Sequence, residues 1–235
     1  MTIGEMHIAF KMWLDKSYGL ELAAFENEEI DFWLNKAVRE FVKTRYSGMN
    51  VKREGFEESQ KRIDDLRTLV IEEDLDVTDG TNKPNSFIAD LTSLIEEYWF
   101  TVGEEVTIEY NDIRSPSVAS TKRQGVIEAT ANNYRALIDN PYSEHRLHYE
   151  EAKPIRLFLG DTVELITDGN YDVTEYHIRF IRKPVEVSIT SDPIVHCDLP
   201  EHTHDEVVKM AVRMALENIE QPRYGSFAQE VSVME

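Results

Sequence analysis

The hydrophobic pattern of this chain changes period twice, and this change constrains the fold more than any single motif does. In the first seventy residues, apolar side chains recur at steps of three and four, which is typical of helices that bury one face. From about residue 98 they alternate with polar side chains, as in strands with one buried face. The helical period returns between residues 201 and 220. We therefore predict an α+β fold with helices at both ends of the sequence and a sheet between them.

Three helices are predicted in an N-terminal helical block, residues 1–70. The first begins near the N-terminus, the second runs from about Asn27 to Gly48, and the third spans about residues 55–69. Acidic residues at the start of the second helix would lie at the positive end of its dipole, and the glycine at its end is a common helix stop.

Residues 71–200 are predicted to form an antiparallel β domain, arranged as a meander or a sandwich. Residues 98–110 place their apolar side chains at even positions, and a bulge is expected at Gly103-Glu104. Residues 76–85 are rich in turn-forming side chains and are predicted to be a loop. The acidic run at 72–76 lacks the pattern of a calcium loop, so we interpret it as a solvated sheet edge.

Further alternating runs follow in the second half of this domain. Short turns with Gly160 and Gly169 separate them, and turns of this length join antiparallel strands rather than parallel ones. A short helix near residues 132–139 is expected to interrupt the sheet. The alternating apolar side chains are Ile155, Leu157, Leu159, Val163, Leu165, Tyr171, Val173, Tyr176, Ile178, Phe180, Val185, Val187 and Ile189.

Residues 201–220 are predicted to be a long C-terminal helix that packs back on the helical block. Thr203 and Glu206 have the spacing of a capping box at its start, and Pro222 ends it. Residues 221–235 keep apolar side chains without a helical period, so we interpret them as an extended tail that docks on a partner. The candidate docking residues are Tyr224, Phe227, Val231 and Val233.

The composition excludes several classes of protein. The chain has 235 residues, with 45 acidic residues against 25 lysines and arginines, a formal charge of −20. This charge argues against a protein that grips nucleic-acid phosphates, although it is compatible with a wall past which DNA slides. The single cysteine, Cys197, excludes a disulfide framework and a four-cysteine zinc site. No apolar run approaches the ~20 residues of a membrane span, so we expect no membrane association.

No common catalytic motif is present, and we predict no enzymatic activity, no cofactor and no bound metal. Glycine-rich nucleotide loops, the Gly-x-Ser-x-Gly elbow and the His-Glu-x-x-His helix are all missing. Two weak candidates for chemistry remain. His196, Cys197, His202 and His204 are zinc-type ligands in the wrong spacing for a known structural site. Glu144, His145, His148, Glu150 and Glu151 are better explained as a solvated loop.

The C-terminal region carries a resemblance to a known family. The residues concerned are Leu199–Val208, Ala211–Ile219 and Pro222-Arg223-Tyr224, with further agreement at Met6–Leu14, Asn140-Pro141, Pro154–Leu157 and Ile181–Pro184. Together they resemble the head-to-tail connector, or neck ring, proteins of crAss-like and related Bacteroidetes phages.

This resemblance implies a structural protein of the virion, made in the host bacterial cytoplasm. Such proteins form a homo-oligomeric ring, commonly of twelve copies, that joins the portal to the tail and lets DNA pass without specific binding. The family implies no catalytic residues. Two alternatives stay open at this point: another tail or baseplate component, and a metal-dependent hydrolase that uses His196, His202 and His204.

Overall fold

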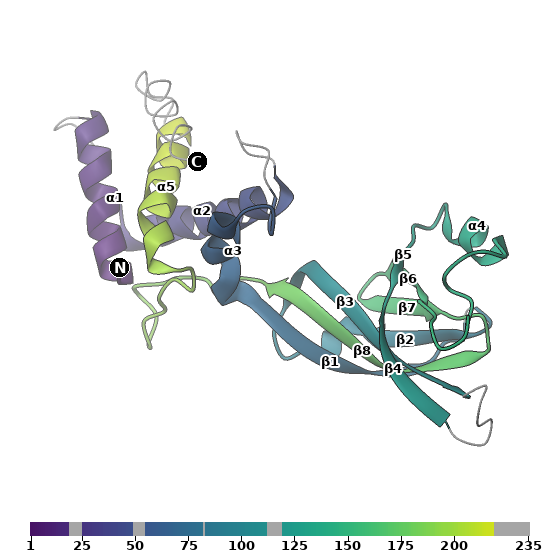
Figure 1. Cartoon of the computed structure of the whole chain (residues 1–235). Coiled ribbons are helices and arrows are strands. Elements are labelled where there is room, and N and C mark those ends of the chain that lie inside the picture. Colours follow the sequence, from purple (N-terminus) through teal and green to yellow (C-terminus); the bar gives the residue numbers. More distant parts are fainter. Residues whose placement is uncertain (19–24, 49–54, 82, 112–118, 219–235) are drawn as a thin grey trace. The chain divides into compact units, whose positions relative to one another are not determined.

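A computed structural model describes residues 1–18, 25–48, 55–81, 83–111 and 119–218 (Figure 1). The chain divides into two compact units. Unit 1 combines Met1–Leu69 with Pro184–Glu235, and unit 2 is the continuous stretch Val70–Lys183. Unit 1 holds the helices that flank the sheet in sequence, and unit 2 holds the whole sheet. The α+β fold class is therefore confirmed.

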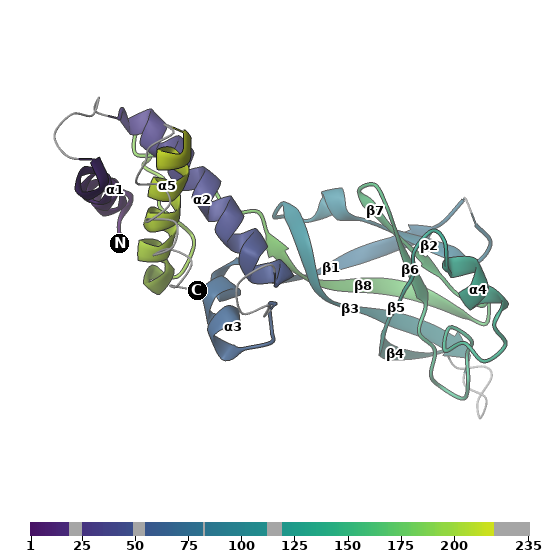
Figure 2. The same cartoon turned by 90° about the horizontal axis from the view of Figure 1, so that it is seen from above.

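Unit 1 is built from four α-helices and two short 3-10 helices within the described residues. They are α1 (Ile3–Tyr18), α2 (Asn27–Ser47), α3 (Gln60–Leu66), η1 (Arg67–Leu69), η3 (Glu201–Thr203) and α5 (His204–Asn218). The third helix is shorter than predicted: it begins at Gln60, after turns at residues 56–59, and its last turn tightens into η1. α5 packs against both α1 and α2, although these segments lie at opposite ends of the sequence (Figures 1 and 2).

Apolar side chains at helical spacing form the core of unit 1. The fully buried ones include Met6, Phe10, Ile30, Leu34, Ala37, Phe41, Val207, Ala211 and Ala215. At the end of α2, Gly48 has φ = 67°, a left-handed conformation that glycine adopts without strain. The helix therefore ends where the sequence predicts.

Unit 2 is an eight-stranded sheet in the order β4-β3-β8-β1-β2-β7-β6-β5. The strands are β1 (Val70–Asp79), β2 (Ser86–Asp90), β3 (Tyr98–Asn111), β4 (Ala119–Gly125), β5 (Ile127–Glu128), β6 (Ile155–Leu159), β7 (Thr162–Ile166) and β8 (Tyr171–Arg182), with η2 (Leu91–Ser93) and α4 (Tyr134–Asp139) between them. Every pair is antiparallel except β5 with β6. The sheet curls around a buried cluster that includes Val106, Leu165, Tyr176 and Phe180 (Figure 2).

The strand order differs from a simple meander. β7 and β8 follow each other in sequence, but β8 lies between β3 and β1 and pairs with both. The register of β3 against β8 shifts between Thr101 and Gly103, so the bulge predicted there is confirmed. The short helix α4 also lies where the sequence places one.

Three local predictions are wrong, each because of contacts distant in sequence. Residues 76–79 belong to β1 rather than to a loop, since they pair with β8 and β2. The acidic run at 72–76 is in the middle of the sheet rather than at an edge; Glu72, Asp74 and Asp76 stay hydrated by facing outward, and Glu73 accepts the amide of Ile95 at 3.0 Å. Residues 185–189 form no strand, because their backbone amides donate hydrogen bonds to side chains of α2. The amide of Val187 donates to Asn35 (2.8 Å), and that of Ile189 donates to Asp31 (3.1 Å).

Candidate functional site: the charged outer face of the sheet

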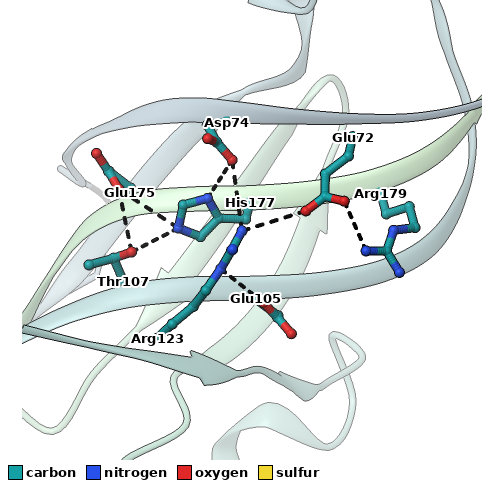
Figure 3. Close-up of polar contacts among 8 residues, drawn as sticks. All are labelled: Glu72, Asp74, Glu105, Thr107, Arg123, Glu175, His177 and Arg179. Carbon is teal, nitrogen blue, oxygen red and sulfur yellow. Dashed lines mark hydrogen bonds and ion pairs between the residues drawn. The ribbon is translucent and has the colours of Figure 1, made fainter.

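Four adjacent strands of unit 2 present a charged face on the side of the sheet away from the core. Each strand alternates: in β1, for example, Leu75 points into the core while Glu72 and Asp74 point outward. The register places Asp74 opposite His177 and Glu72 opposite Arg179. Carboxylates and cationic groups from different strands therefore lie side by side (Figure 3).

His177 lies at the centre of this face, and both nitrogens of its ring are engaged. Nδ1 contacts the carboxylate of Asp74, and Nε2 lies 2.7 Å from Oγ1 of Thr107 and 3.8 Å from Oε2 of Glu175. The side chain is only 8% exposed. The imidazole thus links β8 to β1 on one side and to β3 on the other.

Two arginines extend the network across the face. Arg123 on β4 places Nε 2.9 Å from Glu105 and Nη2 3.7 Å from Glu72 and 3.9 Å from Asp74. Arg179 on β8 donates to Glu72 at 2.8 Å. This hydrogen bond, with the charge of the same guanidinium, lowers the pKa of Glu72 below its ordinary value of 4.5.

The Thr107–His177–Asp74 contacts resemble a hydroxyl–imidazole–carboxylate relay, but they do not make an acyl-transfer site. Such a site needs unpaired donors that stabilise a developing oxyanion. Thr107 lies in the middle of β3, which pairs with β4 on one side and β8 on the other, so its backbone belongs to the sheet ladder. The relay therefore ties strands together.

The face as a whole is acidic. Among the residues of Figure 3, four carry carboxylates (Glu72, Asp74, Glu105 and Glu175) and two carry guanidinium groups (Arg123 and Arg179). The excess negative charge repels polyanions, and the cross-strand pairs keep the strands in register. The face is therefore a net negative surface whose strands are tied together by cross-strand contacts.

The histidine cluster expected near the C-terminal helix does not assemble. The three rings have different partners: the amide of Ile3 donates to His196 Nδ1 (3.3 Å), His202 Nε2 lies 3.0 Å from Asp65, and His204 Nε2 donates to the carbonyl of Leu199 (2.8 Å). Burial raises the pKa of the Cys197 thiol to about 11, which disfavours the thiolate that zinc binds. Among the described residues, no three His, Cys, Asp or Glu side chains form a metal site.

The second candidate, around His145, is not a solvated loop throughout. His145 is buried, and burial lowers its pKa below 6.5. The hydroxyl of Tyr171 donates to its carbonyl oxygen at 2.9 Å, which fixes the segment against β8. Glu144 is exposed and pairs with Lys153 at 2.7 Å. This segment is a structural part of unit 2 with a solvated rim.

The predicted docking residues Tyr224, Phe227, Val231 and Val233 lie outside the described residues. The charged outer face was not predicted from the sequence. A signal for it was present, since charged residues recur at steps of two in 72–76 and again in 175–179. That period indicates one exposed face on each strand, but it does not tell which strands become neighbours.

Comparison with known proteins decides the family. The family model described as phage tail ring protein 3/4 matches residues 1–223. The chain belongs to this family. Ring protein 4/5 of Bacteroides phage crAss001 is 24% identical over 198 residues, which make up 77% of this chain and 78% of that protein. The resemblance to crAss-like phage ring proteins is thereby confirmed.

Family membership makes the chain a structural ring protein of a phage tail. The family and the relative are ring proteins. None of the described helices has the length and apolar character needed to span a membrane. The match ends at Arg223, so all four predicted docking residues lie beyond it.

Proposed function

We propose that this ring protein is a head-to-tail adaptor, which forms a ring of twelve copies between the portal and the tail. The single observation that carries the proposal is membership of the tail ring family over residues 1–223. The adaptor position adds to that membership a contact with the portal above and with other tail proteins below. We place the protein in the neck of the virion.

An acidic chain suits a ring through which DNA passes. DNA carries one negative charge per ~1.7 Å of its axis, so a wall that attracted phosphates would hold the genome back. The chain carries a net charge of −20, and the outer face of the sheet has more carboxylates than cationic groups. We propose that an acidic surface of this kind lines the passage.

The tail at residues 221–235 supports assembly in the same proposal. Its side chains at Tyr224, Phe227, Val231 and Val233 are apolar and follow a helix that ends at Asn218. A short apolar segment of this kind gains affinity when a partner surface covers it. We propose that it docks on a neighbouring subunit of the assembled ring.

Affinity capture tests the adaptor position. The tagged chain would be coexpressed with the portal and tail proteins of the same phage, captured, and cross-linked before mass spectrometry. We expect recovery of the portal and at least one tail protein, with cross-links from this chain to both. Electron microscopy of the captured complex would then give the copy number.

A ring elsewhere in the tail or baseplate is the alternative, and membership of the tail ring family is compatible with it as well. Capture of tail proteins without the portal would establish this alternative and overturn the adaptor position. An untagged lysate and an unrelated tagged protein of similar charge serve as controls for adhesion.

A further inference from the structure

A groove in unit 2 with mixed polar and apolar lining lies where η2 and the start of β3 meet the β6–β7 hairpin. Its volume is about 530 Å³, and its apolar lining includes Leu94, Tyr98 and Phe158. Phe158 is 37% exposed, and the neighbouring residues Ile95 and Leu159 are 89% and 46% exposed. Large apolar side chains that are exposed next to one another on a protein surface are typical of an interaction site.

The floor of the groove is fixed before any partner arrives. The ring centroids of Phe158 and Tyr98 lie 6.3 Å apart. The guanidinium carbon of Arg156 lies 4.3 Å from the centroid of the Phe158 ring. Arg156 is in turn held by Glu104, with Nε 2.7 Å from Oε2. A partner side chain therefore meets a rigid aromatic surface, which reduces the entropy lost on binding.

The rim of the groove is acidic, and one of its carboxylates is available. Glu96 lies 3.9 Å from Arg182, and Glu97 pairs with Lys183 at 3.0 Å. Asp161 is exposed and forms no ion pair with any residue that the structure describes. The groove therefore fits an occupant with aromatic side chains and a single positive charge.

One segment of this chain has that chemistry. Residues 221–229 read Gln-Pro-Arg-Tyr-Gly-Ser-Phe-Ala-Gln, in which Arg223 is the only charged side chain and Tyr224 and Phe227 are the aromatic ones. We propose that this segment of a second copy binds the groove, with its aromatic side chains on Phe158 and Tyr98 and with Arg223 paired to Asp161. The assignment to a second copy rests on the proposed ring.

The remainder of the tail is not part of this contact. Residues 230–235 carry Glu230 and Glu235, which the acidic rim would repel. The contact is heterologous, since a segment of unit 1 in one subunit meets unit 2 of the next. Contacts of this type close into a ring when the rotation between subunits permits it.

A charge exchange tests the contact. A fluorescent peptide of residues 219–235 would be titrated into the full chain whose own segment is disabled by Tyr224→Ser and Phe227→Ser, with binding followed by anisotropy. Asp161→Arg in that chain, or Arg223→Asp in the peptide, should each weaken binding at least about tenfold. The two changes together should recover most of the affinity.

The control is Asp139→Arg, which reverses an exposed acid on α4 of the same unit and should leave binding unchanged. No binding by the unaltered peptide would overturn the proposal, as would equal weakening by Asp139→Arg or absence of recovery in the exchanged pair. Each of these results concerns the groove alone. Portal capture is measured separately, so a failed adaptor position and a failed groove contact are distinguishable.

A disulfide trap decides which copy supplies the segment. Leu159→Cys and Phe227→Cys would be introduced into the full chain with Cys197→Ala, and the oxidised protein run on a non-reducing gel. Cross-linked species at multiples of the chain mass support a second copy. A cross-link confined to the single-chain band would show that the chain binds its own segment and would overturn the intersubunit contact.

Discussion

At the scale of single residues, unit 1 contains a buried cluster of ion pairs. Arg45 on α2 is 2% exposed. Its Nε lies 3.1 Å from Asp65 on α3, and its guanidinium also contacts Glu206 on α5. One guanidinium thus connects three helices that are distant in sequence. Removing one partner of such a cluster leaves the other charges buried without compensation, which costs more than the pair itself contributes.

Arg45→Ala should therefore lower the free energy of unfolding by about 3–5 kcal/mol, because the buried carboxylate of Asp65 would lose its guanidinium partner. Urea denaturation followed by far-ultraviolet circular dichroism measures the change. Glu40→Ala, which removes an exposed charge from the same helix, should have an effect within about 0.5 kcal/mol. Equal effects of the two changes would show that the buried cluster has no special role.

The outer face of the sheet gives a prediction about pH. Arg179 lowers the pKa of Glu72 below 4.5, so the folded state holds this carboxylate ionised at a pH where the unfolded chain protonates it. The contribution to stability is present above pH 4.5 and disappears as the pH falls through the lower folded pKa. In Arg179→Ala, the pKa should rise toward 4.5, as measured by carboxyl NMR titration.

Lys183→Ala is the matched control, since that lysine pairs with Glu97 rather than with Glu72. The Glu72 titration should be the same in this variant as in the unaltered chain. A Glu72 pKa that stayed low without Arg179 would assign the shift to Arg123, the second guanidinium near this carboxylate.

At the scale of elements, two glycines on neighbouring helices should respond in opposite directions to alanine. Gly48 ends α2 at φ = 67°, so Gly48→Ala should destabilise the protein by about 1 kcal/mol. Gly4 lies inside α1, and a Cβ there would meet nothing within 4 Å, so Gly4→Ala should stabilise by about 0.5 kcal/mol. Thermal denaturation of both variants checks the signs, and a loss of stability in both would contradict the assignment.

The elements themselves could be predicted wherever the local pattern agrees with the tertiary contacts. The alternation in β3 and the three-to-four spacing in α2 both reflect one buried face, and both elements are where the sequence places them. Residues 185–189 alternate as well, yet their backbone amides donate hydrogen bonds to the side chains of Asn35 and Asp31 rather than to a neighbouring strand. Local pattern records which face is buried, but not what provides the hydrogen bonds.

The same limit explains what was missed at the outer face. The spacing of Glu72, Asp74 and His177 marks them as exposed on their own strands, but the contact between Asp74 and His177 depends on β1 pairing with β8. That pairing joins residues about a hundred positions apart, with β2 to β7 inserted between them. No short-range signal in the sequence specifies it.

At the scale of the whole molecule, unit 2 is a continuous insertion into unit 1. The two ends of the insertion are adjacent, since Val70 at the start of β1 is the register partner of Ile181 near the end of β8. Partners in an antiparallel pair lie only ~5 Å apart. The polypeptide of unit 1 could therefore be rejoined across this gap by a short linker.

Residues 70–183 expressed alone should fold, because the buried cluster around Tyr176 and Phe180 lies entirely within them. We expect a β-type circular dichroism spectrum and cooperative thermal unfolding. Unit 1, rejoined from Leu69 to Pro184 through about four glycines, should keep its helical spectrum, since α5 packs on α1 and α2 without any strand. A fragment of residues 70–172 is the control: it lacks most of β8, which pairs with both β1 and β3, and should remain unfolded. If the complete unit 2 fragment were also unfolded, the sheet would depend on the helices, and the two units would be a single cooperative domain.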